Sequence, residues 1–269
     1  MIEINFFWIG SKVTPVEVLA FKSCISNNMQ PVLWVYEKVE NVPDFVIIKD
    51  ADLLLKKELV EQFLYQLKLP IPNISDIFRY ELLYNLGGIY SDTDIVFIDN
   101  LEKIKESEYF CSTFEYQYNE CANGCLMRLE KGSAISKYLL DEVRLRLNNF
   151  EKGISKELHY CDLGPFIVQK CASETDIKIL AYDIINPISW RFTDKIIAYK
   201  KPDYKFNLKN LIRRYLPGNE KRGYWVTKNT LAVHLCHEMW KQKGIDKYKP
   251  LNPSCLYEQL RKKYKLNYH

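Results

Sequence analysis

The chain has 269 residues, 47% of them hydrophobic and 14% aromatic, which suits one α/β domain with a large buried core and excludes a disordered or fibrous protein. The formal net charge of +4 is unevenly spread, because residues 200–269 carry 17 basic and 5 acidic side chains (net +12) and residues 1–199 carry 21 and 29 (net −8). A basic end on an acidic body predicts an anionic partner for the C-terminal part.

Strand and helix patterns alternate along the first part of the chain. Short apolar runs predict buried strands at 2–9, 32–36 and 45–48, and the segments between them predict helices at 15–28 and 52–67. This alternation is typical of an α/β fold with a mixed, mostly parallel sheet and helices on both faces. No internal repeat or low-complexity linker divides the chain, so we expect a single domain.

The middle of the chain combines a helix, a glycine pair and two carboxylates. A helix is predicted at 76–86, with Ser75 as its N-cap, and Gly87-Gly88 ends it because glycine accepts the left-handed C-terminal conformation. A strand at 89–98 follows and contains Asp92 and Asp94. The remaining expected elements are a loop at 115–124, a helix at 135–147, a turn at 163–165 that leads into another helix, and a short helix around 205–215.

The carboxylates of Asp92 and Asp94 carry the main functional prediction. In an extended segment, side chains two residues apart project from the same side of the backbone. Like charges held that close repel each other unless a cation bridges them or water solvates them. Oxygen ligands suit Mn²⁺ or Mg²⁺, which stabilise the charge that accumulates on a departing diphosphate. The alternative is a turn with two solvated aspartates.

Asp76 and Arg79 lie three residues apart on the helix that leads to this strand, so their side chains point the same way. They could form a surface ion pair worth less than ~1 kcal/mol. Their position directly upstream of Gly-Gly and the Asp-x-Asp pair instead favours a joint role in one site.

The two segments Ser75-Asp76-Ile77-Phe78-Arg79-Tyr80 and Leu86-Gly87-Gly88-Ile89-Tyr90-Ser91-Asp92-Thr93-Asp94 resemble the signature of glycosyltransferase family 32, the DXD sugar-transferases. That family includes bacterial capsule and O-antigen transferases, and it is similar in layout to the catalytic domains of clostridial glucosylating toxins. The resemblance continues more weakly at Phe7-Trp8-Ile9-Gly10, Asn123-Gly124, Gly164-Pro165 and from His234 to Trp240. Leu163 and Met239 depart from the pattern, since such proteins often have Thr and Ser at these positions.

The resemblance implies a GT-A fold over residues 1–269, retention of anomeric configuration and a divalent metal. About residues 1–110 would bind the nucleotide-sugar, and about residues 111–269 would face the acceptor. By position, Trp8 would stack on the nucleobase, Asp92 would contact ribose or metal, and Asp94 would be the direct metal ligand. The other donor-site residues that it implies are Gly10, Asp76, Arg79, Tyr80, Asn123, Trp240 and Lys241.

The segment from His234 to Trp240 offers a further metal ligand. The resemblance favours His234, while His237 and Glu238 stay open as alternatives. A zincin motif is excluded because Lys241 stands where its second histidine would be. A structural zinc site is a further alternative, without paired-cysteine spacing, that would draw on Cys121, Cys125, Cys236 and His237.

No residue declares itself as a catalytic nucleophile. Asp162 is the nearest candidate beside the catalytic carboxylates Asp92 and Asp94, although its position favours an ordinary surface aspartate. A front-face route, in which the leaving phosphate oxygen helps to deprotonate the acceptor hydroxyl, needs no such group. Lys241 and Lys243 could contact the diphosphate or remain solvated.

The short helix around 205–215 is amphipathic, with Leu208, Leu211, Ile212 and Tyr215 on one face and Lys205, Lys209, Arg213 and Arg214 on the other. One interpretation is peripheral docking on the anionic inner face of the cytoplasmic membrane, which would bring the site to a lipid-linked glycan acceptor. The other is that the apolar stripe packs into the core. No nucleic-acid-binding motif is recognisable.

A cytoplasmic location is expected. The first residues lack a signal-peptide pattern, and no apolar run approaches the ~20 residues that span a bilayer. The eight cysteines show no framework spacing, which fits reduced thiols.

The carboxylate pair and the resemblance together imply a metal-dependent, retaining transferase that moves galactose, glucose or an N-acetylhexosamine from a nucleotide diphosphate-sugar to a glycan acceptor. The resemblance places it in capsule or O-antigen synthesis and favours UDP as the nucleotide. One alternative is a haloacid dehalogenase-type phosphatase, whose Asp-x-Asp-x-Thr/Val motif is satisfied from Asp92 to Val96. That motif needs a long apolar strand before it and an acidic pair after it, and the sequence has neither. The other alternative is a non-catalytic nucleotide-sugar-binding module.

Overall fold

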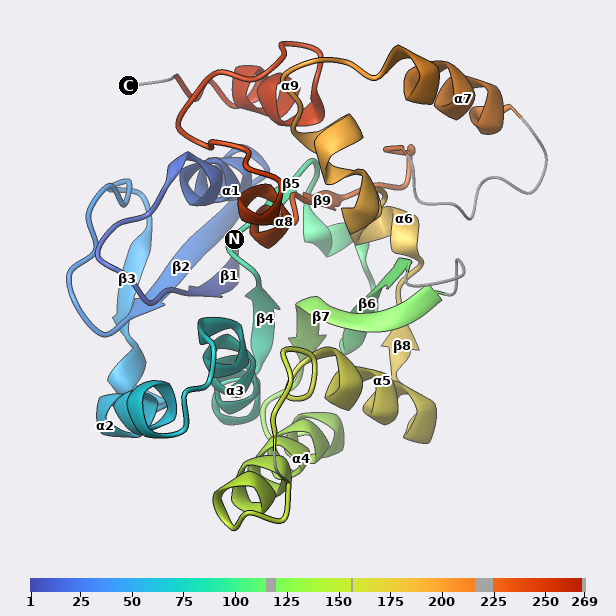
Figure 1. Ribbon diagram of the computed structural model, residues 1–269. Helices are drawn as coiled ribbons and strands as arrows, with labels where there is room; N and C mark the ends of the chain where they lie inside the picture. The colour runs from blue at the N-terminus through green and yellow to red at the C-terminus, as the bar shows by residue number, and fades with distance from the viewer. Residues whose placement is uncertain (115–119, 156, 216–224, 268–269) are drawn as a thin grey trace.

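The computed structural model describes residues 1–114, 120–155, 157–215 and 225–267, which form an α/β fold around a seven-stranded sheet (Figure 1). The sheet has the order β3-β2-β1-β4-β7-β6-β8. Its strands are β1 (Ile2–Phe7), β2 (Met29–Val35), β3 (Ile47–Asp50), β4 (Gly88–Ser91), β6 (Tyr109–Phe114), β7 (Glu120–Leu129) and β8 (Lys178–Ile179). Strand β7 runs antiparallel to its neighbours β4 and β6, and the other pairs are parallel, so the expected mixed, mostly parallel sheet is confirmed.

Helices cover both faces of this sheet, as expected (Figure 1). One face packs against α2 (Lys57–Glu61), α3 (Ile71–Asn85), α4 (Ala134–Glu151) and α5 (Pro165–Glu174). The opposite face packs against α1 (Pro15–Ser26) and α6 (Tyr182–Ile185). A second, two-stranded sheet of β5 (Ile95–Phe97) and β9 (Ala232–His234) packs on α1 together with α8 (His237–Gln242) and α9 (Leu256–Lys263). The helix α7 (Tyr204–Arg214) and short 3-10 or π-helical segments at Ala51–Leu53, Gln62–Gln66, Leu101–Lys103, Trp190–Phe192 and Thr193–Ile197 complete the described elements.

The alternation of side chains along the central strands supplies both cores. On β2, Val32 and Trp34 point toward α3, whereas Leu33 and Val35 point toward α1. A strand that is buried on both faces needs apolar residues at consecutive positions, which explains the continuous apolar runs of the sequence.

Three expected elements around the Asp-x-Asp segment differ from the structure. The strand expected at 89–98 is two strands, β4 and β5, in different sheets, because residues 92–94 form a turn. The helix expected at 76–86 begins earlier, at Ile71, because Pro72 suits the first helical turn and Pro70 stands at the N-cap. Ser75 is therefore no cap but lies inside α3, where its hydroxyl is 2.8 Å from that of Tyr90.

Two further expectations need correction. The helix expected at 52–67 is interrupted, because the backbone is extended at Lys56 and α2 begins only at Lys57, whose main-chain N–H donates to the Asp52 carboxylate (2.8 Å). In the loop expected at 115–124, residues 115–119 lie outside the described residues, and β7 already begins at Glu120. The glycine-terminated helix is confirmed: Gly87 has φ +71°, and a β-carbon there would lie 2.5 Å from the Lys131 main-chain nitrogen.

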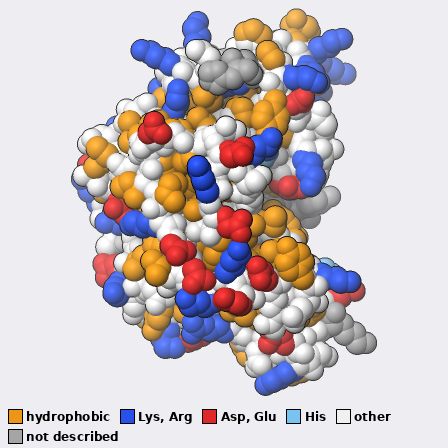
Figure 2. Space-filling view, turned by 90° about the vertical axis from the view of Figure 1, so that its left-hand side faces the viewer, with side chains coloured by type: hydrophobic (Ala, Val, Ile, Leu, Met, Phe, Trp, Pro, Cys, Tyr) orange, Lys and Arg blue, Asp and Glu red, His pale blue; other side chains and the backbone are white. Residues whose placement is uncertain are grey.

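The edge strand β3 is bordered by charges. Lys49 pairs with Glu3 at 3.1 Å beside the exposed Ile47 and Ile48, and Figure 2 shows basic and acidic side chains interspersed with hydrophobic ones on this side of the molecule. Charges next to an edge strand oppose pairing with another chain. Basic side chains also project at the top of Figure 2, at the height of α9 in Figure 1. Within the described residues, no helix is both long and apolar enough to cross a membrane.

Candidate functional site

The candidate site lies where the strand order of the main sheet reverses. From β1 the chain continues to β2 and β3 on one side, and β4 pairs with β1 on the other side. In α/β sheets, ligands bind at the carboxyl ends of strands at such a switch point. Trp8 directly follows β1 and Asp92 directly follows β4, so the fold brings the residues expected to bind base and metal to one edge of the sheet.

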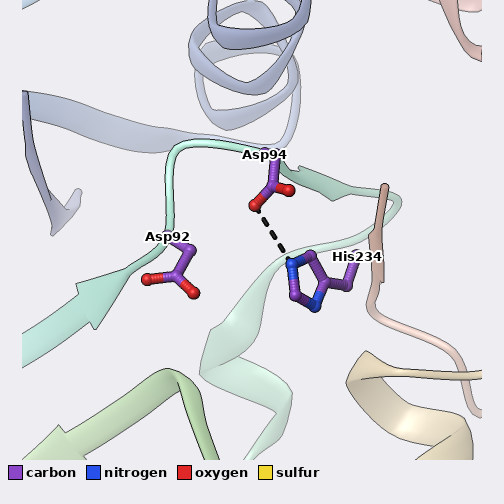
Figure 3. A group of neighbouring side chains, drawn as sticks. All are labelled: Asp92, Asp94 and His234. Carbon is purple, nitrogen blue, oxygen red and sulfur yellow. Dashed lines mark ion pairs between the residues drawn. The ribbon is translucent and has the colours of Figure 1, made fainter. Parts of the chain in front are cut away.

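Asp92, Asp94 and His234 come together as a candidate metal centre (Figure 3). One ligand atom of each residue lies within 4.8 Å of the others. The two carboxylates meet because residues 92–94 turn between β4 and β5, and not because they share one side of a strand, as expected from the sequence. His234 arrives from β9, which pairs with β5 in the register Ile95↔His234, and its Nε2 lies 3.2 Å from Oδ1 of Asp94.

Asp94 is held by several polar contacts. The main-chain N–H of His237 donates to Oδ2 of Asp94 (2.8 Å), and the N–H of Leu235 donates to its carbonyl oxygen (3.0 Å). Burial works to raise the pKa of Asp94, but the His234 imidazole and the hydrogen bond from the His237 N–H outweigh it and leave that pKa lowered. Asp94 therefore stays ionised, the form that a metal ligand needs.

Asp92 has the opposite shift. Burial raises its pKa to about 7, the Arg79 guanidinium opposes that rise, and the neighbouring Asp94 adds to it. Two carboxylates and an imidazole form an oxygen and nitrogen donor set that suits Mn²⁺, and a cation would relieve the repulsion between Asp92 and Asp94. The residues present thus fit the divalent metal that the sequence predicts.

The alternative ligands are not supported. Across the described parts of the chain, Asp92, Asp94 and His234 are the one group of three or more potential ligands within metal-binding distance of one another. The structural zinc site is therefore wrong: its four residues do not gather, and Cys125 instead packs with its sulfur 3.3 Å from that of Cys111. All eight cysteines are free thiols.

A buried ion pair lies behind the metal group. Arg79 donates from Nη2 to Oδ1 of Asp92 (2.6 Å) and from Nη1 to the carbonyl of Gly124 (2.9 Å), and its Nη1 is 3.1 Å from Oδ1 of Asp76. The side chains of Asp76 and Arg79 are 8% and 7% exposed, so they are not the surface pair that was the alternative. Burial raises the pKa of Asp76 to about 6, although Arg79 acts to lower it.

Two glycines make room for this pair. A β-carbon at Gly124 would lie 2.7 Å from Nη1 of Arg79, and one at Gly164 would lie 2.3 Å from Oδ2 of Asp76. The short motifs Asn123-Gly124 and Gly164-Pro165 therefore have a steric reason. Tyr80 is fully buried, and its hydroxyl donates to the Gly164 carbonyl (3.4 Å), so it supports this wall from behind.

Three of the residues expected to bind the donor are Trp8 and Gly10, which follow β1, and Asn123 on β7. Trp8 is half-buried, and its Nε1 is buried without a hydrogen-bond partner among the described residues. Gly10 has φ +148°, and a β-carbon there would lie 3.1 Å from that nitrogen. Asn123 lies on β7, where its Oδ1 accepts from the main-chain N–H of Cys125 (2.8 Å), and the Cys125 carbonyl accepts from the N–H of Asp92 (2.7 Å).

The remaining expected residues are not among the ligands of the metal group. Trp240 is buried in α8 and donates to the carbonyl of Leu235 (2.9 Å), so it supports the turn that follows His234. Lys241 is exposed, and Lys243 pairs with Asp194. Asp162 accepts from the main-chain N–H of His159 (2.7 Å) and stabilises a local turn.

Two side chains that sequence reasoning missed surround His237. The buried carboxylate of Glu17 lies 3.5 Å from Nδ1 of His237, and the ammonium of Lys247 lies 2.9 Å from its Nε2. The imidazole of His237 thus faces these two groups, which leaves His234 in the metal group. Thr14-x-x-Glu17 is a recognisable capping box, but that pattern signals only a helix start.

Residues 15–111 match the family model described as "Glycosyltransferase sugar-binding region containing DXD motif". Among solved structures, "PaToxG Glycosyltransferase" is 16% identical with a TM-score of 0.49 over 97% of this chain and 86% of that one. The glycosyltransferase GlyE of Streptococcus pneumoniae TIGR4 is 13% identical with a TM-score of 0.48, over 99% of this chain and 61% of that one. The UDP-bound glycosyltransferase domain of the YGT toxin is 9% identical with a TM-score of 0.45, over 96% and 81%. No curated protein matches the sequence.

The matched region contains the Asp76–Arg79 pair and the Asp-x-Asp turn, which are the parts that the fold brings together. The protein is accordingly an enzyme that transfers sugars. Residues 15–111 resemble the sugar-binding region of DXD glycosyltransferases, as the sequence analysis expected, and they lie in an α/β fold with a mixed, mostly parallel sheet.

Proposed function

We propose that the protein is a metal-dependent, retaining hexosyltransferase that uses a UDP-sugar and extends a glycan acceptor in capsule or O-antigen synthesis. The observation that carries this proposal is the group of Asp92, Asp94 and His234 at the switch point of the sheet, directly in front of the buried Asp76–Arg79 pair. The donor sugars that fit the proposal are galactose, glucose and the N-acetylhexosamines. In this view residues 1–269 form one domain, with the donor bound mainly by residues 1–110 and the acceptor by residues 111–269.

The metal would be Mn²⁺ or Mg²⁺, held by Asp94, His234 and Asp92. When bound, it supplies charge stabilisation to the departing diphosphate. The protein groups orient the rest of the donor. Trp8, at the end of β1, stacks on the base. The buried Asp76 accepts hydrogen bonds from sugar hydroxyls, and the buried Arg79 donates hydrogen bonds to them. Hydrogen bonds at buried groups are stronger than those in water.

The proposed route is a front-face substitution. The bond between the anomeric carbon and the phosphate oxygen breaks, and the acceptor oxygen bonds to that carbon from the same face. The acceptor proton passes to the leaving phosphate oxygen. This route uses no protein nucleophile, which agrees with the engagement of Asp162 in a local turn.

A panel of nucleotide-sugars, incubated with and without added Mn²⁺, tests the proposal. We expect a UDP-sugar to be hydrolysed, or its sugar to be transferred, only when the metal is present. Phosphate release from phosphomonoesters would support the phosphatase alternative. Binding of a UDP-sugar without any turnover, with or without sugar acceptors, would support the binding-module alternative.

We further propose that α7 docks the enzyme on the anionic inner face of the cytoplasmic membrane, beside a lipid-linked acceptor. The sequence left open whether its apolar stripe packs into the core, and Leu208, Leu211 and Ile212 are 59%, 53% and 52% exposed. The helix is anchored instead through Phe206, which is buried and stacks on Phe192 with the ring centroids 5.3 Å apart.

The charge around this face favours an anionic lipid surface as its occupant. Lys205 and Lys209 are exposed beside the apolar stripe, and the helix has no acidic residue. Exposed apolar side chains flanked by basic ones match the interface of an anionic bilayer, which accepts both.

A further inference from the structure

A buried carboxylate in α1 has only part of its hydrogen-bonding capacity satisfied. Glu17 is fully buried, and its Oε2 accepts hydrogen bonds from the main-chain N–H (2.7 Å) and the hydroxyl of Thr14. Its Oε1 is buried and has no hydrogen-bond partner among the described residues. A buried carboxylate needs compensating positive charge or hydrogen-bond donors. The burial of Oε1 therefore strongly favours keeping the polar groups that face it in place.

The groups that face Oε1 belong to the C-terminal part of the chain. Nδ1 of His237 lies 3.5 Å from it, and Nε2 of the same ring lies 2.9 Å from Nζ of Lys247. Glu17, His237 and Lys247 thus form a row of carboxylate, imidazole and ammonium that joins α1 to α8 and the segment after it. A capping box alone would use only one oxygen of Glu17.

His237 is also attached to the metal group, through its backbone. Its main-chain N–H donates to Oδ2 of Asp94 (2.8 Å), which leaves Oδ1 of Asp94 facing His234 (3.2 Å). The residue before it, Cys236, has a left-handed backbone conformation (φ 52°), which is unfavourable for a side chain with a β-carbon and persists only where surrounding contacts enforce it.

We propose that Glu17 is a positioning residue for the metal-binding carboxylate: it holds the imidazole of His237, and thereby the backbone amide that orients Asp94. Glu17 touches neither metal nor donor. Through the contact between α1 and α8, it determines which oxygen of Asp94 faces the metal. This inference rests on the proposed metal site.

The test measures binding of Mn²⁺ alone, by the loss of the paramagnetic resonance signal of free Mn²⁺, to the full chain without donor. The variants are Glu17→Gln, which keeps the bonds to Thr14, His237→Ala, which keeps the backbone amide, and the double variant. Thr14→Val is the matched control, because it weakens the same helix start without changing a group that faces His237. Thermal unfolding of each variant reports whether it is folded.

We expect Glu17→Gln and His237→Ala each to raise the Kd for Mn²⁺ about 10-fold, in the range seen when groups behind metal ligands are removed. The Kd of the double variant for Mn²⁺ should be no higher than that of the single variant with the higher Kd, because both changes break the same connection. Thr14→Val should lower the melting temperature and leave the Kd for Mn²⁺ unchanged.

Two outcomes overturn the inference: folded Glu17→Gln and His237→Ala proteins that keep the native Kd for Mn²⁺, or effects that add in the double variant. A loss of affinity in Thr14→Val as large as in Glu17→Gln would also overturn it, since helix stability alone would then explain the result. If the native chain itself fails to bind Mn²⁺, the proposed metal-dependent function fails instead.

Discussion

A β-carbon at position 164 would lie 2.3 Å from Oδ2 of Asp76, so Gly164 and Asp76 occupy space that no larger residue at 164 could share. Replacing Gly164 by Ala must displace the Asp76–Arg79 pair, and overpacking of this kind costs roughly 1–3 kcal/mol. We expect Gly164→Ala to lower the melting temperature and to reduce sugar transfer at least about 10-fold, a change equivalent to ~1.4 kcal/mol. The control is Gly153→Ala, where a β-carbon meets nothing within 4 Å and only backbone strain at φ +68° is added. Equal activity losses in both variants would contradict the steric argument.

The metal group predicts that turnover requires the carboxylate of Asp94. Asp94→Asn should remain folded and lose more than nine-tenths of its turnover, because removal of a metal ligand costs several kcal/mol. Activity of the native enzyme should vanish in chelator and return with Mn²⁺. Asp141→Asn, which alters an exposed aspartate paired with Lys137, is the control and should behave like the native enzyme. Turnover of Asp94→Asn above a tenth of native would rule out the assignment.

The two sides of the donor site should separate in calorimetry. Trp8→Ala should weaken UDP and UDP-sugar alike by about 1–3 kcal/mol, the value of a base stack. Asp76→Asn should weaken the UDP-sugar while leaving UDP unchanged, because Asp76 is assigned to sugar hydroxyls. If Asp76→Asn impaired both ligands equally, Asp76 would belong to the nucleotide side.

The raised pKa of Asp76 predicts a pH dependence of sugar recognition. Burial raises this pKa to about 6, so the carboxylate gains a proton and loses its charge as the pH falls through about 6. The affinity for UDP-sugar relative to UDP should then fall, by at most about 10-fold per pH unit. The stability contribution has the opposite sign: a folded-state pKa above the unfolded one means that protonation stabilises the fold as the pH falls from about 6 toward 4. Calorimetry between pH 5 and about 8 should show the step in the native protein and none in Asp76→Asn.

The exposed face of α7 predicts binding to anionic vesicles. The native protein should sediment with vesicles that contain an anionic lipid, less so at raised salt, and not with neutral vesicles. Lys205→Glu with Lys209→Glu should weaken binding by about 1 kcal/mol or more per residue, and Leu211→Ser should weaken it at any salt concentration. Lys131→Glu with Lys152→Glu, which make the same charge change on exposed residues of the acidic part, is the control. Sedimentation that is equal for neutral and anionic vesicles would exclude the docking proposal.

The sequence was sufficient for the α/β class and for the carboxylates because both leave local patterns. Apolar runs such as residues 32–36 report burial on both faces of a strand, and Asp92 and Asp94 are separated by one residue in a short motif. Local patterns could not show that the apolar stretch at 89–98 divides. That division depends on the pairing of β5 with β9, which lies far away in the chain.

The same limit applies to the third ligand. His234 and His237 are three residues apart and chemically identical, and distant contacts distinguish them: Glu17 and Lys247 engage the ring of His237, whereas the pairing of β9 with β5 places His234 beside Asp94. The motif Thr14-x-x-Glu17 has a complete local explanation as a capping box, so nothing in it indicates a second partner. The exposure of Leu208 and Leu211 is likewise a tertiary property, because an amphipathic pattern specifies a face but not what covers it.

The pairing of β5 with β9 also has a consequence for protein synthesis. The two-stranded sheet cannot form until residues 232–234 have been synthesised, because they pair with residues 95–97. His234 belongs to this second strand. At a ribosomal rate of roughly 5–20 residues per second, the Asp-x-Asp turn is synthesised several seconds before its imidazole partner. We expect a nascent chain during this interval to have both carboxylates without the third ligand. The enzyme would thus become competent to cleave its donor only after residues 232–234 have been synthesised.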